Sequence, residues 1–429
     1  MNNIEKRLAE EKERIDSITA PEEVEMRLSR ALKKIPPKRK KLIAPILKIA
    51  VALFFVAIIS YQYNALAFYG KKLIGFDEVM TGTLQQLNEE GKGQIVEKKI
   101  VLEDGTNFII NGIMTDANQL VMYYTVANPK GVDYFSSDPF SGSRITGFLT
   151  NSNRGGGWAS INENQAEIKG TMSFDPVSPF SKKLTFHYWQ HQQNGQMKEE
   201  SVTFPYNPNK AMQTEVKQRI KKTLKVDKGT ITFDSITATP TMTVIAGTLN
   251  VKNFDRVHSA LFGVELIANG VPVETLGSGS SSSFMGTRFD IRYDRLPKPL
   301  KSLELVMKEF VGYQVLGEKI PLISAGTDER IALNGKELWV KDVSATSRGV
   351  EITIATDQDV MLDGVSIEIQ NESIPLTTTV NQNLIKKENG QELKERTLLF
   401  DTKEKPEYLL IRGMHYMKQY NKKIVIPVS

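Results

Sequence analysis

An apolar run near the N-terminus constrains this chain most, because it separates a small basic segment from a large polar one. Residues 49–59 contain no polar side chain, and the wider stretch 43–63 carries one charge, Lys48. A helix of about 20 mostly apolar residues spans the hydrocarbon core of a bilayer. A lysine near one end of such a helix extends its ammonium group to the lipid headgroups. The sequence therefore predicts one transmembrane helix over residues 43–63.

The charges on either side of this segment predict its orientation. Only Lys71 and Lys72 follow it closely, and Asp77 and Glu78 offset them. The cations before it are Arg27, Arg30, Lys33, Lys34, Lys38, Arg39, Lys40 and Lys41. Positively charged flanks stay on the cytoplasmic side of a membrane. We expect a single-pass protein of the cell membrane, with a cytoplasmic N-terminus and an extracellular C-terminal body.

Two other interpretations of the apolar run are open. It could be a buried helix of a globular domain, although folding gives no reason for such asymmetric basic flanks. It could also belong to a cleaved signal sequence, since Ala65 and Ala67 form an A-x-A pattern suited to a signal-peptidase type of cut. The basic region is far longer than an ordinary signal-sequence n-region, so we favour an uncleaved anchor. Secretion of the body after a cut at Ala67 stays as an alternative.

The amino-acid composition limits the classes of protein to which this chain can belong. The 429 residues are enough for several domains. The net charge is +5, but the excess cations lie beside the apolar run, so nothing predicts nucleic-acid binding by the body. There is no cysteine, which excludes disulfides, thiolate catalysis and cysteine-ligated zinc. A large body without disulfides, outside the cytoplasm, fits a bacterium with a single membrane.

Residues 1–41 form the predicted cytoplasmic head, with two short amphipathic helices. About 40 residues of this kind cannot bury a stable core alone. Their apolar faces therefore need each other, the membrane surface or a partner protein. The alternative is a solvated tail that only sets topology. The residues we predict to dock a partner are Leu8, Ile15, Ile18, Val24, Leu28 and Leu32.

Beyond the predicted span, residues 64–94 indicate a juxtamembrane connector with one or two short helices. The chain then repeats a pattern of short strands three times. An aromatic–aspartate pair, a proline-bearing segment and a strand ended by proline recur in the same order. The pairs are Phe174-Asp175, Phe289-Asp290 and Phe400-Asp401, and the strand-ending prolines are Pro205, Pro321 and Pro427.

Each repeat has the length and strand spacing of an immunoglobulin-like β-sandwich, although strand pattern alone does not separate a sandwich from a small barrel. The predicted fold is therefore mainly β: three tandem immunoglobulin-like sandwiches, one transmembrane helix and a short helical head. The predicted boundaries are unit one at 95–207, a polar helical linker at 208–222, unit two at 223–323 and unit three at 330–429. Two glycine- and serine-rich stretches, 151–158 and 277–283, are expected to be mobile loops.

The sequence shows no recognisable catalytic, cofactor-binding or metal-binding motif. His187 and His191 are an i, i+4 pair, and on a strand such residues lie about 13 Å apart, too far for one metal ion. A binding role for Trp158 at a loop tip is a minor alternative. We predict a protein that is not an enzyme and has no cofactor.

The order of parts resembles the family called domain of unknown function 4179, followed by immunoglobulin-like repeats. The residues that carry the resemblance are Gly75-Phe76-Asp77, Gly93-Gln94-Ile95-Val96, Asp104-Gly105, Gly112–Leu120 and Tyr123–Val126. The resemblance implies a single-pass envelope protein of Gram-positive bacteria, and some similar proteins look like anti-sigma factors that hold an extracytoplasmic-function sigma factor. The head here lacks the zinc-binding histidine and cysteine motif of the better-known anti-sigma domain.

Two functions follow as hypotheses. The first is a signalling protein whose body senses an extracytoplasmic ligand and whose head docks a cytoplasmic partner, an extracytoplasmic-function sigma factor by resemblance. The second is a structural or adhesion module of the cell envelope, in which the head has no partner. Both place the chain in the lipid bilayer.

Overall fold

The computed structural model describes residues 73–132, 140, 142–191, 196–283, 286–322, 330–387 and 390–428. The chain divides into two parts, Met1–Ala67 and Phe68–Ser429, and all described residues lie in the second. The predicted head and the predicted span at 43–63 lie outside them. Among the described residues, no helix has the length and apolar character needed to cross a membrane.

The connector folds as two short helices, η1 (Asp77–Val79) and α4 (Gly82–Glu89). Thr81 caps α4, since its side chain accepts a hydrogen bond from Leu84 N. The Asn88 side chain then ties the start of the connector to the helix: Leu73 N donates to Asn88 Oδ1 at 2.7 Å, and Asn88 Nδ2 donates to Leu73 O at 2.9 Å. Asn88 is fully buried, so these bonds fix the chain from residue 73 onward.

Unit one is a sheet of eight strands that curls over one core, with the strands in the order β1-β2-β3-β6-β5-β4-β7-β8. The strands at the two ends of this order, β1 and β8, contact one another. The bounds are β1 (Gln94–Val101), β2 (Asn107–Thr115), β3 (Leu120–Ala127), β4 (Arg144–Gly147), β5 (Thr150–Ile161), β6 (Glu167–Phe174), β7 (Lys183–His191) and β8 (Met197–Pro205).

Strand β3 is buried on both faces, which explains the five consecutive apolar or aromatic residues at 120–124. Leu120, Met122 and Tyr124 point into the core of unit one. Val121 and Tyr123 point outward and pack against Leu73, Phe76 and Leu87 of the connector. The connector is therefore part of the fold of unit one, and the Phe76 and Tyr123 rings meet edge to face at 5.6 Å.

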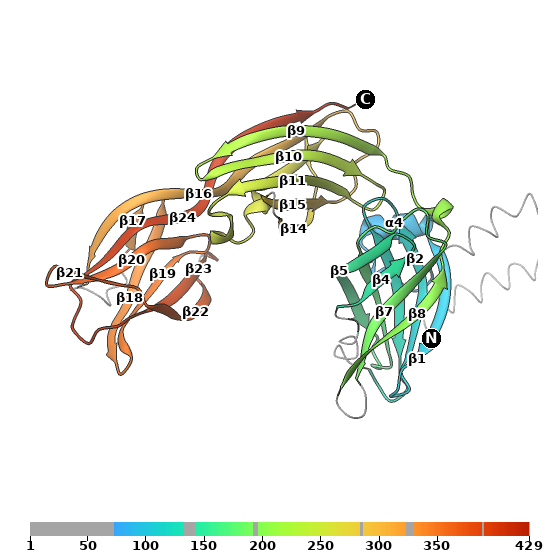
Figure 1. Cartoon of the computed structure of the whole chain (residues 1–429), viewed down its shortest axis with the longest axis horizontal. Helices are drawn as coiled ribbons and strands as arrows, with labels where there is room; N and C mark the ends of the chain where they lie inside the picture. The colour runs from blue at the N-terminus through green and yellow to red at the C-terminus, as the bar shows by residue number, and fades with distance from the viewer. Residues whose placement is uncertain are drawn as a thin grey trace, which may run out of the picture. The chain divides into compact units, whose positions relative to one another are not determined.

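Unit two is a sandwich with the same strand order as unit one. One sheet has the order β9-β10-β11-β15-β14 (Figure 1), and the other contains β13-β12-β16. The bounds are β9 (Val216–Val226), β10 (Gly229–Ala238), β11 (Thr243–Val251), β12 (Val264–Ala268), β13 (Val271–Pro272), β14 (Thr275–Ser283), β15 (Gly286–Tyr293) and β16 (Leu303–Pro321). Short helices η4 (Phe254–Arg256) and η5 (Ala260–Gly263) precede β12.

Unit three repeats the order once more, with β17-β18-β19-β23-β22 facing β21-β20-β24. The bounds are β17 (Arg330–Leu333), β18 (Lys336–Thr346), β19 (Gly349–Asp357), β20 (Met361–Ile369), β21 (Glu372–Pro375), β22 (Thr378–Lys386), β23 (Glu392–Phe400) and β24 (Tyr408–Ile426). In unit one, β5 pairs with β4 at residues 150–153 and with β6 at residues 154–161, and so joins the two halves of the sheet. The pairs β13/β14 and β21/β22 take its place in the later units.

Units two and three exchange their closing strands. In unit one, β7 and β8 form a hairpin in which Leu184 lies opposite Phe204. The equivalent Leu303 of unit two lies opposite Ile426, at the end of the chain, and Leu409 of unit three lies opposite Ile320. Strands β16 and β24, each of 19 residues, therefore run through both sandwiches (Figure 1). Ile424 and Ile426 are buried in the core of unit two, and Ile320 and Leu322 in that of unit three.

The mainly β prediction is confirmed, but four details of the prediction differ from the structure. Residues 208–222 are not a helical linker: η3 (Pro208–Lys210) is followed by strand β9. The spacing of Val216, Ile220 and Leu224 fits a helix, yet on a strand with an irregularity near residue 221 it also faces the core of unit two. The predicted boundaries at 323 and 429 do not separate units two and three, because the closing strands are exchanged.

The other two differences concern the predicted mobile loops and the aromatic–aspartate pair of unit two. The stretches 151–158 and 277–283 lie in strands β5 and β14. A Cβ on Gly157 would overlap Thr171 O of strand β6, so glycine there allows close strand contact. In unit two the aromatic–aspartate pair equivalent to Phe174-Asp175 is Tyr293-Asp294, because Tyr293 pairs with Thr243 as Phe174 pairs with Leu120.

Candidate functional site

Most site residues named from the sequence fall outside the described part of the chain. This is so for Ala65 and Ala67 and for the predicted docking residues Leu8, Ile15, Ile18, Val24, Leu28 and Leu32. His187 is described: its Nε2 lies 2.8 Å from Thr146 Oγ1 and its Nδ1 lies 3.4 Å from Glu199. Trp158 lies on β5 and is 69% exposed. Within the described ranges, no group of three histidine, aspartate or glutamate residues could hold a metal ion.

The site that the structure adds begins where units one and two meet. The turn between β2 and β3 contacts the equivalent turn between β10 and β11. Asn118 Nδ2 donates to Thr237 O at 2.9 Å, to Thr239 Oγ1 at 3.2 Å and to Met242 O at 3.0 Å. Thr241 Oγ1 donates to Asp116 Oδ2 at 2.5 Å. Two turns that the repeat pattern makes equivalent therefore bind one another through polar side chains.

Asp116 is the buried charge of this junction. It also accepts bonds from Thr241 N at 3.2 Å and from Asn118 N at 2.9 Å. Burial raises the pKa of its carboxyl above the ordinary value of 3.8, and the hydrogen bond from Thr241 opposes that shift. The carboxylate has several donors, as a buried charge requires, but no cation lies among the groups that bind it.

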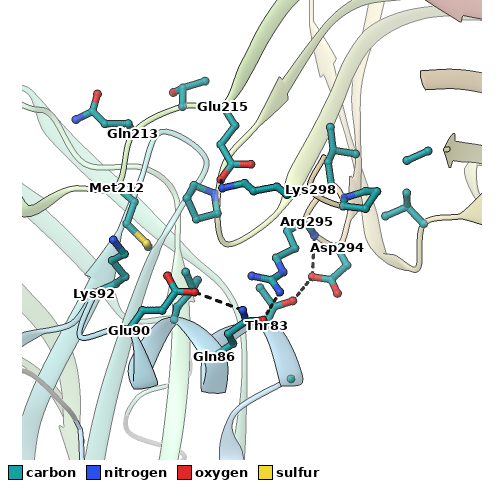
Figure 2. Close-up of a pocket in the computed structure, with 18 of the residues that line it drawn as sticks. Thr83, Gln86, Glu90, Lys92, Met212, Gln213, Glu215, Asp294, Arg295 and Lys298 are labelled. Atoms are coloured by element: carbon teal, nitrogen blue, oxygen red, sulfur yellow. Dashed lines mark hydrogen bonds and ion pairs between the residues drawn. The ribbon is translucent and has the colours of Figure 1, made fainter. Parts of the chain in front are cut away.

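A wide cleft of about 1340 Å³ lies beside this junction. Helix α4 forms one wall, the segment 209–215 forms a second, and the 268–274 and 294–298 segments of unit two form the third (Figure 2). The segment 209–215 is held by backbone bonds to both units, from Met212 N to Thr115 O and from Glu215 N to Ala238 O, each 2.8 Å. The connector and both units thus contribute to one cavity.

Two side chains of α4 reach unit two across the cleft. Thr83 Oγ1 donates to Asp294 Oδ1 at 2.8 Å, and Arg295 Nη2 donates to Gln86 Oε1 (Figure 2). Asp294 is the aspartate of the recurrent aromatic–aspartate pair in unit two. A residue of the repeat pattern therefore binds the connector. On another wall, Lys298 and Glu215 form an ion pair at 2.6 Å, with Lys298 mostly exposed. Exposed pairs of this kind stabilise little and exchange easily with a ligand.

The lining can bind a polar molecule that also has apolar parts. Lys92 and Lys210 have no ion-pair partner within the described ranges, so they are available for an anionic group. Gln213 and Asn269 offer amides that both donate and accept hydrogen bonds. Val271, Pro272 and Pro240 add apolar surface, and Val271 is 65% exposed. The cleft thus offers cationic, amide and apolar groups to a ligand.

Sequence reasoning missed this cleft because its walls come from segments up to about 200 positions apart. One signal was available in strand β3: residues 120–126 lack the alternation seen at 350–354 of unit three. An outward apolar face in unit one means that another element covers it, and the connector is the nearest candidate. The pairing of α4 with residues 294–295 had no such signal.

Comparisons with known proteins support the family resemblance. Residues 38–128 match the family described as Domain of unknown function (DUF4179), which includes the predicted span, the connector and the first strands of unit one. The resemblance predicted from the sequence is thereby confirmed for this segment. No curated protein matches the chain.

Solved structures that match most of this chain include the following two. The conserved domain protein from Bacillus anthracis is 11% identical with a TM-score of 0.37, and the match covers 72% of this chain and 91% of that one. A marsupial T cell receptor is 5% identical with a TM-score of 0.13, covering 72% and 97%. At these TM-scores neither likeness carries an argument about fold or function.

Proposed function

We propose that this protein is a single-pass membrane signalling protein of the anti-sigma-factor type. Its extracytoplasmic body binds a small polar ligand in the cleft beside α4, and its cytoplasmic head at 1–41 docks a regulator, an extracytoplasmic-function sigma factor. The DUF4179 match and the basic flank of the apolar run support the membrane part of the proposal. The body has no catalytic role in this proposal.

The observation that carries the proposal is that helix α4 is both a wall of the cleft and part of the connector. Leu73, which Asn88 fixes to α4, lies ten positions after residue 63, the predicted end of the span. A ligand that contacts α4 and unit two together changes the equilibrium between their bound and separated arrangements. That change acts on the chain segment that leads to the membrane.

The bonds across the cleft are suited to such a response. Thr83 is buried and bonded to Asp294, whereas Gln86 and Arg295 meet at an exposed position. A ligand anion that binds Arg295 or Lys298 competes with Gln86 or Glu215 for the same cation. Each exchange replaces one weak contact by another, so small differences in affinity are enough to shift the arrangement.

Transcript profiles of cells that carry variants of the full chain test this proposal. Replacement of Ile15, Ile18, Leu28 and Leu32 by serine removes the predicted docking face and should change the partner's target transcripts. Thr83→Val together with Asp294→Asn should change the same transcripts at equal protein level. Glu89→Gln, on the exposed side of α4, is the matched control. Silent head variants would contradict the signalling role.

The exchange of strands between units two and three favours a second candidate, a structural module of the envelope. Two sandwiches that share both closing strands form one mechanically continuous body, which suits an arm that carries load. Under this alternative the head only sets topology. The head and cleft variants would then leave transcription unchanged, and loss of the whole chain would alter the envelope.

A further inference from the structure

Strand β9 of unit two carries a row of cations that no function described above uses. Five of its 11 residues are cationic and none is acidic: Lys217, Arg219, Lys221, Lys222 and Lys225. All five are exposed, and within the described ranges none has an ion pair or a side-chain hydrogen bond. Like charges held this close repel one another, so the row costs stability unless something binds it.

The surface beside the row consists mainly of hydrogen-bond donors. Cross-strand neighbours share a face of a sheet. Lys217 lies opposite Thr237, Arg219 opposite Ser235 and Lys225 opposite Thr230. Thr223 and Thr232 lie between them and share a hydrogen bond of 2.9 Å. On β10 the nearby carboxylate is Asp234, and it already accepts a bond from Thr248 at 2.9 Å.

Protection of a sheet edge does not account for this row. β9 is the edge strand of its sheet, and lysines on edges prevent association between sheets. The equivalent edge strands of the other units show how little charge that role needs here. β1 has two lysines and a glutamate, and β17 has one cation, Arg330, which is paired with Glu337. The cations of β9 are therefore specific to unit two.

We propose that the outer face of β9 and β10 is a binding surface for a linear polyanion with closely spaced phosphate groups. Side chains on one face of a strand repeat every two residues, about 6.8 Å. The cations along β9 contact successive anionic groups, and the hydroxyl row of β10 donates to their oxygens. Flexible phosphate polymers bind such rows through charge, with affinity that depends strongly on salt. This surface is distinct from the cleft and does not depend on the signalling proposal.

Lysine-reactivity footprinting of the full chain with long-chain inorganic polyphosphate tests this site residue by residue. Acetylation of Lys217 and Lys225, measured by mass spectrometry, should fall several-fold when polyphosphate is added. Lys98, Lys301 and Lys405, which are also exposed, should react unchanged. Protection of both sets to the same extent, or of neither, would overturn the proposal. Reading individual lysines keeps the result independent of the basic residues at 27–41.

A pair of charge-matched variants gives the second measurement. Lys217→Gln, Arg219→Gln and Lys225→Gln together should reduce the salt dependence of polyphosphate binding. At about 0.7 in log–log slope per contact, three lost contacts remove about 20-fold of the affinity change between about 50 and 200 mM salt. The control, Lys98→Gln, Lys301→Gln and Lys405→Gln, removes the same charge elsewhere. Equal effects of the two triple variants would show general charge attraction and refute the site.

Discussion

Asp116 shows how one side chain joins two repeats of the same fold. Its carboxylate takes hydrogen bonds from its own turn and from Thr241 of the equivalent turn in unit two. A buried polar group without partners costs more than a satisfied one contributes, so each partner depends on the other. The two residues lie 125 positions apart in the chain, and no pattern in the sequence placed one against the other.

Asp116→Ala should destabilise the contact between units one and two. It leaves the Thr241 hydroxyl and backbone donors unsatisfied, at an expected cost of about 2–3 kcal/mol. Asp255→Ala is the control, since the Asp255 side chain is largely exposed. Differential scanning calorimetry and protease sensitivity of segment 209–215 measure the effect. An equal, small effect of both variants would contradict the role assigned to Asp116.

The raised pKa of Asp116 also predicts a pH dependence. A carboxyl whose pKa is higher in the folded state stabilises that state most below its unfolded pKa, here 3.8, and this contribution is lost as pH rises through the folded pKa. The stability of the wild type relative to Asp116→Asn should therefore fall as pH increases above 3.8. Thermal unfolding of the two proteins across pH, in parallel, checks this. A relative stability that grows with pH would be the opposite result.

At the scale of elements, β16 and β24 determine how units two and three depend on one another. Each strand supplies half of its length to each sandwich. The sequence predicted the short proline-ended strands that close each repeat, because their pattern recurs. It did not predict which repeat each strand closes, since the exchanged and unexchanged pairings place similar apolar residues in the same positions.

Ile426→Ala tests the exchange directly. Ile426 lies in the last strand of the chain but is buried in unit two, opposite Leu303. The truncation should cost about 2–5 kcal/mol and should lower hydrogen-exchange protection in β12 and in residues 303–307. Ile411→Ala, in the same strand, should instead loosen β20 of unit three. Loosening of β20 by Ile426→Ala alone would contradict the exchanged pairing.

Local features of the other elements could likewise be predicted from the sequence, whereas long-range pairings could not. The recurring aromatic–aspartate pairs and proline-ended strands predicted a repeated β fold, because local pattern and burial agree there. Strand β9 could not be predicted from residues 208–222, because Val216, Ile220 and Leu224 repeat every four positions, a spacing that fits a helix as well as a strand face. The cleft could not be predicted, since its lining depends on contacts between distant segments. Only the apolar residues on both faces of the strand, at 120–124, indicated that the connector packs on unit one.

In the proposed topology of the whole molecule, the head and the cleft lie on opposite sides of a membrane. The absence of cysteine makes this directly measurable, since each introduced cysteine is the only thiol in the chain. Val271→Cys places a thiol on the exposed wall of the cleft, and Glu10→Cys places one in the head. Intact Gram-positive cells that express either variant can be treated with a membrane-impermeant maleimide. We predict that Val271→Cys is labelled in intact cells and that Glu10→Cys is labelled only after permeabilisation. Labelling of Glu10→Cys in intact cells, or of Val271→Cys only after lysis, would contradict the proposed topology.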